Sequence, residues 1–198
     1  MIYYILVLIC YYTGVRQTEA LGLMWHDINW DTGKIIIHRK LAYNRITHID
    51  YIGPTINKVD RIFQAPPALL SALAEWREEQ QRHKSQLGRN YQDNEKLENT
   101  IEGGTIKAGD FVLRFPNGKS MNGSEASHFR ERAQKKLGDQ LTFHGLRHTV
   151  VSRLSGSGVP LKNISHFIGH ADSRTTEKYY LGIDELGEEK LMAAIANL

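Results

Sequence analysis

The residues of this chain that could perform chemistry are concentrated between positions 141 and 181. His144 and Arg147 are three residues apart, so on a helix both side chains would point from one face towards a single anion. Arginine stays charged and can donate two parallel hydrogen bonds to phosphate oxygens, while histidine can donate or hold a proton near neutral pH. Two adjacent tyrosines, Tyr179 and Tyr180, follow, and a tyrosine hydroxyl can attack phosphorus to form a covalent intermediate. Together these residue types predict phosphoryl transfer on a phosphodiester.

The order of these residues resembles the C-terminal signature of the tyrosine recombinases, the phage-integrase family. The segment HGLRHT is followed by a helical stretch, then by IGH and then by TTEKYY. The resemblance implies that His144 and Arg147 are catalytic and that His170 braces the scissile phosphate. It also implies that one of the two tyrosines is the nucleophile. Considered alone, His170 would instead be a satisfied, half-buried side chain.

A second stretch, TGVRQTEALGLMWHDI, resembles the first arginine box of the same family. The resemblance implies that Arg16 is the other catalytic arginine and that Glu19 supports the site, whereas Asp27 is structural. Without the resemblance, Arg16 and Glu19 are equally compatible with a surface ion pair at (i, i+3) spacing. Such a pair contributes little to stability.

Further basic residues are candidates for contacts with a nucleic acid. The segment KVDRIFQAP resembles the family's lysine-bearing turn, which implies that Lys58 is the general acid that protonates the leaving 5′ oxygen; a solvated turn lysine is the alternative. The helix predicted near the middle of the C-terminal half carries four basic residues that could contact the DNA backbone, namely Arg130, Arg132, Lys135 and Lys136. A solvated basic face is as compatible with these four residues, because Glu131 interrupts them.

The composition is that of a globular protein from a reducing compartment. A single cysteine, Cys10, excludes a disulfide framework. The formal net charge of +3 is mildly basic, which is compatible with nucleic acid but does not require it. The apolar N-terminal run is too short to span a bilayer and lacks the basic start of a signal peptide. We therefore expect a cytoplasmic, nucleoid-associated protein, and the resemblance implies that it is encoded by a bacterium or a phage.

The hydrophobic patterns predict an α+β fold that is mainly helical. The N-terminal apolar run predicts a buried helix ending near Thr13, with Gly14 as its cap. Further helices are predicted at 68–84, at 122–137, around 142–154 and at 160–168. Strands are predicted at 34–38, 46–52, 61–64 and 111–115, and the polar segment 86–110 predicts a long loop. The resemblance implies that the strands form a small antiparallel sheet.

The resemblance covers residues 1–198 as a catalytic domain, without the start of that domain and without the family's N-terminal DNA-clamping domain. It implies transesterification through a 3′-phosphotyrosine with release of a 5′-hydroxyl. Arg16 and Arg147 would hold the non-bridging oxygens of the phosphate. The bond energy is kept in the enzyme–DNA link, so the resemblance implies no cofactor, no metal and no ATP. The implied partners are double-stranded DNA attachment sites and three further copies of the chain in a homotetramer.

Three alternatives remain open at the level of sequence. The pairs His144/His148 and His166/His170 have the (i, i+4) spacing of helical zinc ligands, although Arg147 would repel a cation. A DNA-binding relative without catalysis is the second alternative. The third is strand breakage of the type IB topoisomerase kind, which uses the same tyrosine chemistry.

The identity of the nucleophile can be tested directly. Tyr179 and Tyr180 point about 100° apart on a helix, so they cannot share the role. The run Tyr180-Leu181-Gly182-Ile183 resembles a family variant in which the nucleophile precedes an apolar-Gly-apolar step, so we expect Tyr180 to attack. Tyr180→Phe should then abolish the covalent protein–DNA adduct on a suicide duplex, while Tyr179→Phe retains it. The reverse pattern would assign the attack to Tyr179.

Overall fold

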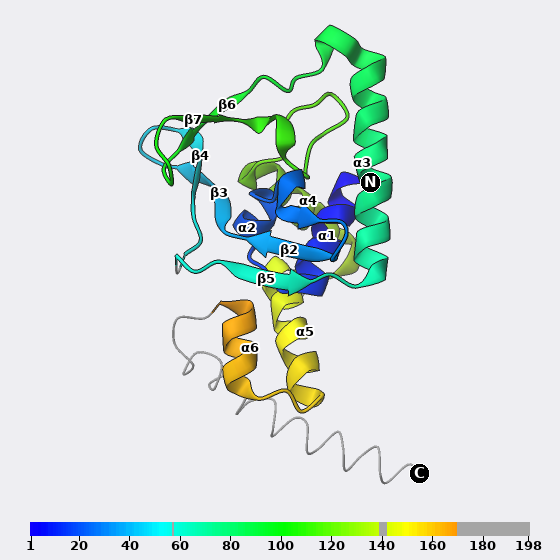
Figure 1. Ribbon diagram of the computed structural model, residues 1–198, viewed down its shortest axis with the longest axis vertical. Coiled ribbons are helices and arrows are strands. Elements are labelled where there is room, and N and C mark those ends of the chain that lie inside the picture. Colours follow the sequence, from blue (N-terminus) through cyan, green and yellow to red (C-terminus); the bar gives the residue numbers. More distant parts are fainter. Residues whose placement is uncertain (57, 139–141, 170–198) are drawn as a thin grey trace.

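A buried helix, α1 (Ile2–Thr13), lies at the centre of the computed structural model, which describes residues 1–56, 58–138 and 142–169 (Figure 1). Ile5 and Ile9 have no exposed surface, because the helix is covered by other elements on several sides. The helix ends at Gly14, whose φ of 62° is left-handed and whose N–H donates to the Cys10 carbonyl at 2.9 Å. The predicted N-terminal core helix and its glycine cap are confirmed.

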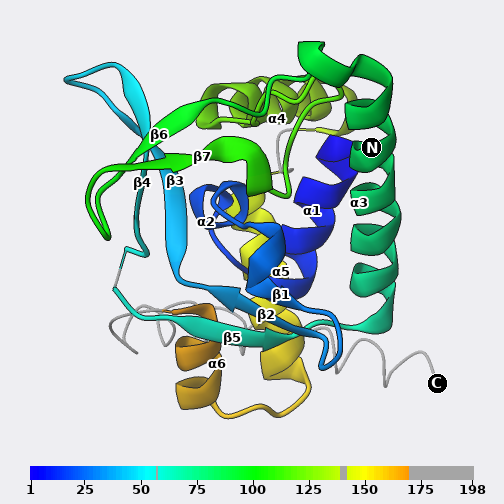
Figure 2. The same ribbon diagram turned by 45° about the horizontal axis from the view of Figure 1, so that its top comes forward.

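Two longer helices pack against α1 from different sides. The helix α3 (Pro67–Leu87) runs along one edge of the molecule, and α5 (Phe143–Gly156) contacts α1 and extends away from the sheets together with α6 (Leu161–Ile168) (Figures 1 and 2). The remaining helical segments are α2 (Gln17–Leu21), α4 (Gly123–Leu137) and the 3₁₀ turns Trp25–Asp27, Gly88–Asn90 and Ala108–Asp110. No helix among the described residues is long and apolar enough to cross a membrane.

The strands form two small sheets. The first is antiparallel and has the order β1-β2-β5, with strands Ile28–Asn29, Lys34–Ile37 and Arg61–Gln64. The second has the order β3-β4-β6-β7, with strands Arg39–Asn44, Ile49–Pro54, Lys96–Asn99 and Thr105–Lys107. In the first sheet Ile35 faces Phe63, and both are buried, so one face of this sheet covers the core. Helices contain more of the described residues than strands do, which confirms the mainly helical α+β class.

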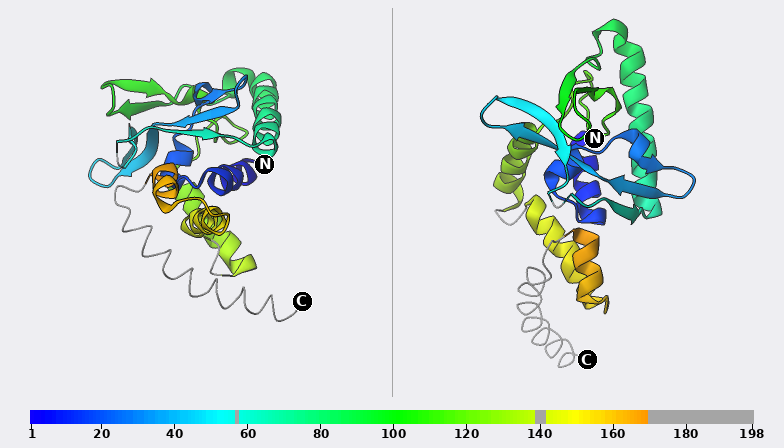
Figure 3. Two further views of the ribbon diagram at one scale, coloured as in Figure 1. Left: turned by 60° about the horizontal axis from the view of Figure 1, so that its bottom comes forward. Right: turned by 60° about the vertical axis from the view of Figure 1, so that its left-hand side comes forward.

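Several sequence expectations about the strands are wrong. The strand predicted at 46–52 begins at Ile49, because Ile46 lies in the loop of the projecting β3–β4 hairpin and is 89% exposed (Figure 3). The segment 86–110 is not a long loop: it contains β6 and β7, and β6 pairs in parallel with β4. The strand predicted at 111–115 is reduced to isolated bridges, Met24 with Phe111 and Arg114 with Ser120. Pairing with distant segments decides the second case, where β6 pairs with β4, and part of the third, where Phe111 pairs with Met24.

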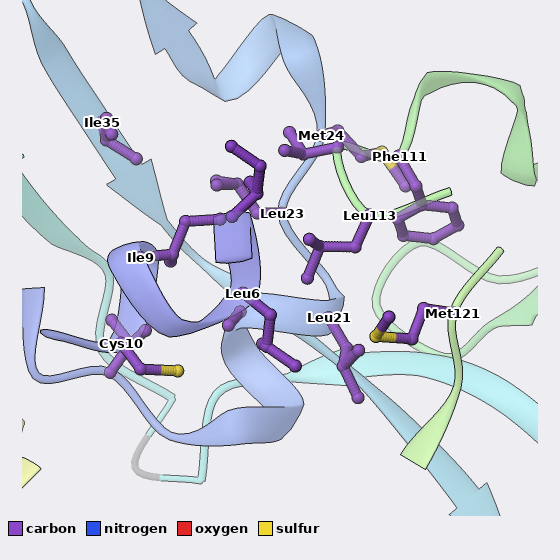
Figure 4. Close-up of a cluster of buried hydrophobic side chains, with 14 of the residues drawn as sticks. Leu6, Ile9, Cys10, Leu21, Leu23, Met24, Ile35, Phe111, Leu113 and Met121 are labelled. Atoms are coloured by element: carbon purple, nitrogen blue, oxygen red, sulfur yellow. The ribbon is translucent and has the colours of Figure 1, made fainter. Parts of the chain in front are cut away.

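The core collects side chains from elements that are distant in sequence. Figure 4 shows Leu6 and Ile9 of α1 facing Leu21, Leu113 and residues of the neighbouring segments. All of these side chains have at most 1% of their surface exposed. The thiol of Cys10 lies in the same cluster, and burial raises its pKa to about 12, so it stays protonated at neutral pH.

Several buried polar groups are paired within the fold. Asp27 is buried and accepts hydrogen bonds from the Met24 N–H at 2.8 Å and from Arg39 at 2.9 Å, which confirms its structural role. Asn122 begins α4 by accepting hydrogen bonds from two N–H groups of its first turn. Thr142 begins α5 in the same way, accepting from the Gly145 N–H at 2.7 Å. These caps fix where the helices that carry basic residues begin.

Helix α3 provides a matched test of the core. Leu69 has no exposed surface, whereas Leu87 at the end of the same helix is 38% exposed. Leu69→Ala should lower the free energy of unfolding by about 2–5 kcal/mol, because it leaves a cavity in the core. Leu87→Ala should change the same quantity by less than about 0.5 kcal/mol. Urea denaturation of both variants measures the difference, and equal effects would contradict this assignment of the core.

Candidate active site

Arg16 and Glu19 lie at the start of α2, directly after the glycine that ends α1. The carboxylate of Glu19 is completely buried and accepts the backbone N–H of Arg16 at 2.9 Å. The Arg16 guanidinium lies 3.5 Å from the other carboxylate oxygen and remains 28% exposed. Glu19 therefore fixes the backbone that carries Arg16, so the two residues are not a surface ion pair.

Arg147 is the most deeply buried of the predicted catalytic residues on α5. Only 3% of its surface is exposed. Its guanidinium donates to the carbonyl of Gly14 at 2.6 Å and to the carbonyl of Ile168, the last residue of α6. Carbonyls at helix ends lack intrahelical partners and carry partial negative charge, so they hold a guanidinium well. Arg147 thereby ties the ends of α1 and α6 to α5.

The charge state of Arg147 follows from its neighbours. Burial, followed by the charges of Arg16 and Arg61, lowers its pKa to about 10, against an opposing effect of Glu19. A pKa near 10 leaves the group protonated at neutral pH. The guanidinium is thus a fixed positive charge next to other positive charges, which is the arrangement expected of an anion site.

Arg61, the first residue of β5, is a member of this cluster that the sequence interpretation missed. It is 4% exposed, donates to the Ile168 carbonyl at 2.8 Å and forms an ion pair with Glu19. The sequence contains one signal for it. Strand alternation puts Arg61 on the same face as Phe63, and an arginine on the buried face of a strand requires partners.

An open cleft of about 490 Å³ brings together residues from α2, α4 and α5. Arg16, His144, Arg147 and Arg130 are among its lining residues. The ring of the exposed His144 lies edge-to-face with His148, their centroids 4.4 Å apart. Burial, then His144 and Arg147, lower the pKa of His148, so it is neutral at pH 7. The cleft therefore offers three arginines, Arg16, Arg130 and Arg147, and the accessible imidazole of His144 to a single ligand.

The remaining predicted site residues are not placed in the cleft by the described part of the structure. Lys58 is exposed in the turn between β4 and β5, with a left-handed φ of 53° and its N–H donating to the Thr55 carbonyl at 3.0 Å. It is not among the described residues that line the cleft. His170, Tyr179 and Tyr180 lie outside the described residues.

The four basic residues of α4 differ in their surroundings. Arg130 lines the cleft and lies 3.8 Å from a Glu131 carboxylate oxygen. Arg132 donates to the Tyr3 hydroxyl at 3.3 Å and lies over the Tyr3 ring. Lys135 and Lys136 are exposed near the end of the helix. Arg130 is thus the member of this set that the structure brings next to Arg16 and Arg147.

Comparison with known proteins identifies the family to which this chain belongs. The phage integrase family matches residues 1–185, so the chain is a member of that family. The tyrosine recombinase XerC-like protein of Caldanaerobacter subterraneus subsp. tengcongensis is 30% identical over 186 residues, covering 88% of this chain and 44% of that protein. The chain therefore spans less than half the length of this curated relative.

Solved structures share the fold. The Tn1549 transposon integrase, solved in complex with transposon right end DNA, superposes with a TM-score of 0.69 at 20% identity, covering 96% of this chain and 59% of that one. The XerH site-specific recombinase, solved bound to a palindromic difH substrate, gives a TM-score of 0.62 at 19% identity and covers 96% and 44% of the two chains. At these identities the similarity establishes the fold alone.

Glu19 allows a test of the cluster that does not depend on activity. Glu19→Gln keeps the shape of the side chain but leaves the buried Arg61 without its counter-charge. The free energy of unfolding should fall by about 3–5 kcal/mol, the cost of breaking a buried ion pair. Glu131→Gln, on the exposed pair with Arg130, should change it by less than about 1 kcal/mol. Similar effects in both variants would show that the Glu19 charge is unimportant to the fold.

Proposed function

We propose that residues 1–198 act as the catalytic part of a site-specific DNA recombinase, which cuts and rejoins duplex DNA through a 3′-phosphotyrosine. The observation that carries this proposal is the cleft in which Arg16, Arg147 and His144 meet. A phosphodiester is an anion with two non-bridging oxygens, and two guanidiniums from different elements suit it. The DNA in the structures of the Tn1549 integrase and XerH supports duplex DNA as the ligand.

The proposed reaction is a transesterification that conserves bond energy. The tyrosine oxygen, Tyr180 or alternatively Tyr179, attacks phosphorus and forms the P–O bond of the phosphotyrosine. The bond to the 5′ oxygen breaks, and this oxygen takes up a proton for which Lys58 is the proposed donor. Arg16 and Arg147 stabilise the additional negative charge on the pentacoordinate phosphorane, while His144 and His170 hold or exchange protons. Attack by a 5′-hydroxyl of the partner strand reverses the step.

The proposed binding surface extends from the cleft along α4. Arg130 is the nearest basic residue, and Arg132, Lys135 and Lys136 continue towards the end of the helix. These groups would contact phosphates irrespective of sequence, so the affinity for DNA should fall as the salt concentration rises. Recombination joins two duplexes, and a homotetramer on DNA attachment sites in the cytoplasm of a bacterium is the proposed assembly.

The central test compares arginine variants in a single-turnover assay of adduct formation on a suicide duplex. Arg16→Ala and Arg147→Ala should each lower the rate by about 10²–10³, the scale of losing one charge-stabilising donor in the transition state. Arg89→Ala, an exposed arginine next to the end of α3, is the matched control and should leave the rate unchanged. Adduct formation at the wild-type rate in either cleft variant would remove that arginine from the site.

The same assay in EDTA separates this proposal from a metal-dependent hydrolase. Adduct formation should persist in the chelator, because the arginines and not a cation stabilise the charge. Loss of the adduct in EDTA and its recovery with zinc or magnesium would favour the histidine pairs instead. A protein that binds the duplex but never forms an adduct would be the non-catalytic DNA-binding relative.

A further inference from the structure

Arg61 joins three elements of the fold. It belongs to β5, pairs with Glu19 of α2 and donates to the Ile168 carbonyl of α6 at 2.8 Å. Phe63 of the same strand packs edge-to-face against Phe167 of α6, with ring centroids 4.8 Å apart. The guanidinium of Arg61 therefore adds a polar contact to the apolar one between β5 and α6.

The Ile168 carbonyl is shared by two arginines. Arg61 and Arg147 both donate to it, and a carbonyl oxygen has two lone pairs, so its capacity is filled. Arg147 has one further partner at the end of α1, the Gly14 carbonyl. The direction of the Arg147 guanidinium consequently depends on where Arg61 holds the end of α6.

The Glu19 carboxylate is shared in the same way. Arg61 is buried and pairs with one oxygen, whereas Arg16 is partly exposed and lies at 3.5 Å from the other oxygen. Arg61 is therefore the main counter-charge of Glu19. Because Arg61 neutralises this carboxylate, Arg16 keeps its positive charge available to the cleft.

The backbone after α6 is built to accommodate Arg61. Gly169 has a left-handed φ of 68°, and a Cβ at this position would lie 2.9 Å from both Cδ and Nε of Arg61. A side chain here would push the arginine out of its place. The close approach sets the path of the chain as it leaves α6, directly before His170 in the sequence.

We propose that Arg61 is a positioning residue of the recombinase reaction, one that aims Arg147 and frees Arg16 for the scissile phosphate without contacting the DNA. This inference rests on the proposed function, since it assigns Arg61 a part in the same reaction. The role requires a charge and two separate donor groups, one for Glu19 and one for Ile168. A guanidinium provides both, whereas an ammonium is a single point of charge.

The test uses the intact chain, a suicide duplex and three variants. Arg61→Met keeps the length of the side chain without its charge, and Arg61→Lys restores only the charge. Arg114→Met is the matched control, because Arg114 is 2% exposed and donates to the backbone carbonyls of Gly118, Gly109 and Gln92. Each variant is measured for its melting temperature, its affinity for the duplex and its single-turnover rate of adduct formation.

Arg61→Met should form the adduct about 10- to 100-fold more slowly, the scale of a misplaced catalytic group, with its DNA affinity within about twofold of wild type. Arg61→Lys should recover part of this rate. Arg114→Met should lower the melting temperature but keep the wild-type rate per folded molecule. An unchanged rate in Arg61→Met, or a loss of DNA affinity large enough to explain the slower rate, would overturn the positioning role. If Arg61→Met does not fold, Arg61→Lys decides by the same criteria, with a smaller loss of rate.

A double-mutant cycle asks whether Arg61 acts through Arg147. In the Arg147→Ala background, Arg61→Met should lower the rate by a smaller factor than in the wild-type background, because the group that it aims is already absent and only its effect through Arg16 remains. An equal loss in both backgrounds would assign Arg61 an independent role and overturn the inference. A wild-type protein that forms no adduct would contradict the proposed function itself, which is a different outcome.

A spectroscopic measurement keeps the inference testable without catalysis. The Arg147 guanidinium donates through Nη1 and Nη2, so its Nη–H NMR signal should exchange slowly with solvent. In Arg61→Met that signal should shift and exchange faster, whereas Arg114→Met should leave it unchanged. An Arg147 signal that is unaffected in Arg61→Met would overturn the positioning role, whatever the activity of the protein.

Discussion

The buried carboxylate of Glu19 is the constraint on which the arginine cluster depends. A fully buried carboxylate must be paired, because leaving one uncompensated costs several kcal/mol. Arg61 provides the pair from β5, and the Arg16 N–H provides a hydrogen bond from the start of α2. This requirement brings the first antiparallel sheet against the turn between α1 and α2. The fold and the cleft therefore rest on the same ion pair.

The ends of two helices hold Arg147, the second buried arginine of the cluster. The carbonyls of Gly14 and Ile168 both accept from Arg147, at the ends of α1 and α6. Each of these helices ends at a glycine with left-handed φ, which turns the chain away and exposes the last carbonyls to a donor. An arginine that satisfies two helix ends has little freedom to reorient. The hydrogen bonds that close these helices thus also preorganise the guanidinium that faces the cleft.

Features set by neighbouring residues could be predicted from the sequence. Features that depend on contacts between residues far apart in the chain could not. The (i, i+3) spacing of Arg16 and Glu19 and the cap at Gly14 are local features, so the sequence pattern predicted them and the structure contains them. Strand β6 has a single buried apolar residue, Leu97, and gains its partner from β4, far away in the chain, so its pattern indicated a loop. The sequence interpretation missed Arg61 for the same reason, since its partners Glu19 and Ile168 are 42 and 107 residues away.

The charges of the cluster indicate why the site suits a phosphodiester under attack. Arg16, Arg61 and Arg147 contribute three positive charges and Glu19 one negative charge, which leaves two positive charges in excess among these four residues. Without a ligand these charges repel one another, and after burial this repulsion is the second cause of the lowered pKa of Arg147. A phosphodiester brings one negative charge, and attack by a tyrosinate adds a second in the phosphorane. In the reaction that we propose, this repulsion is therefore relieved most fully in the transition state, which is the condition for accelerating a reaction and not merely for binding its substrate.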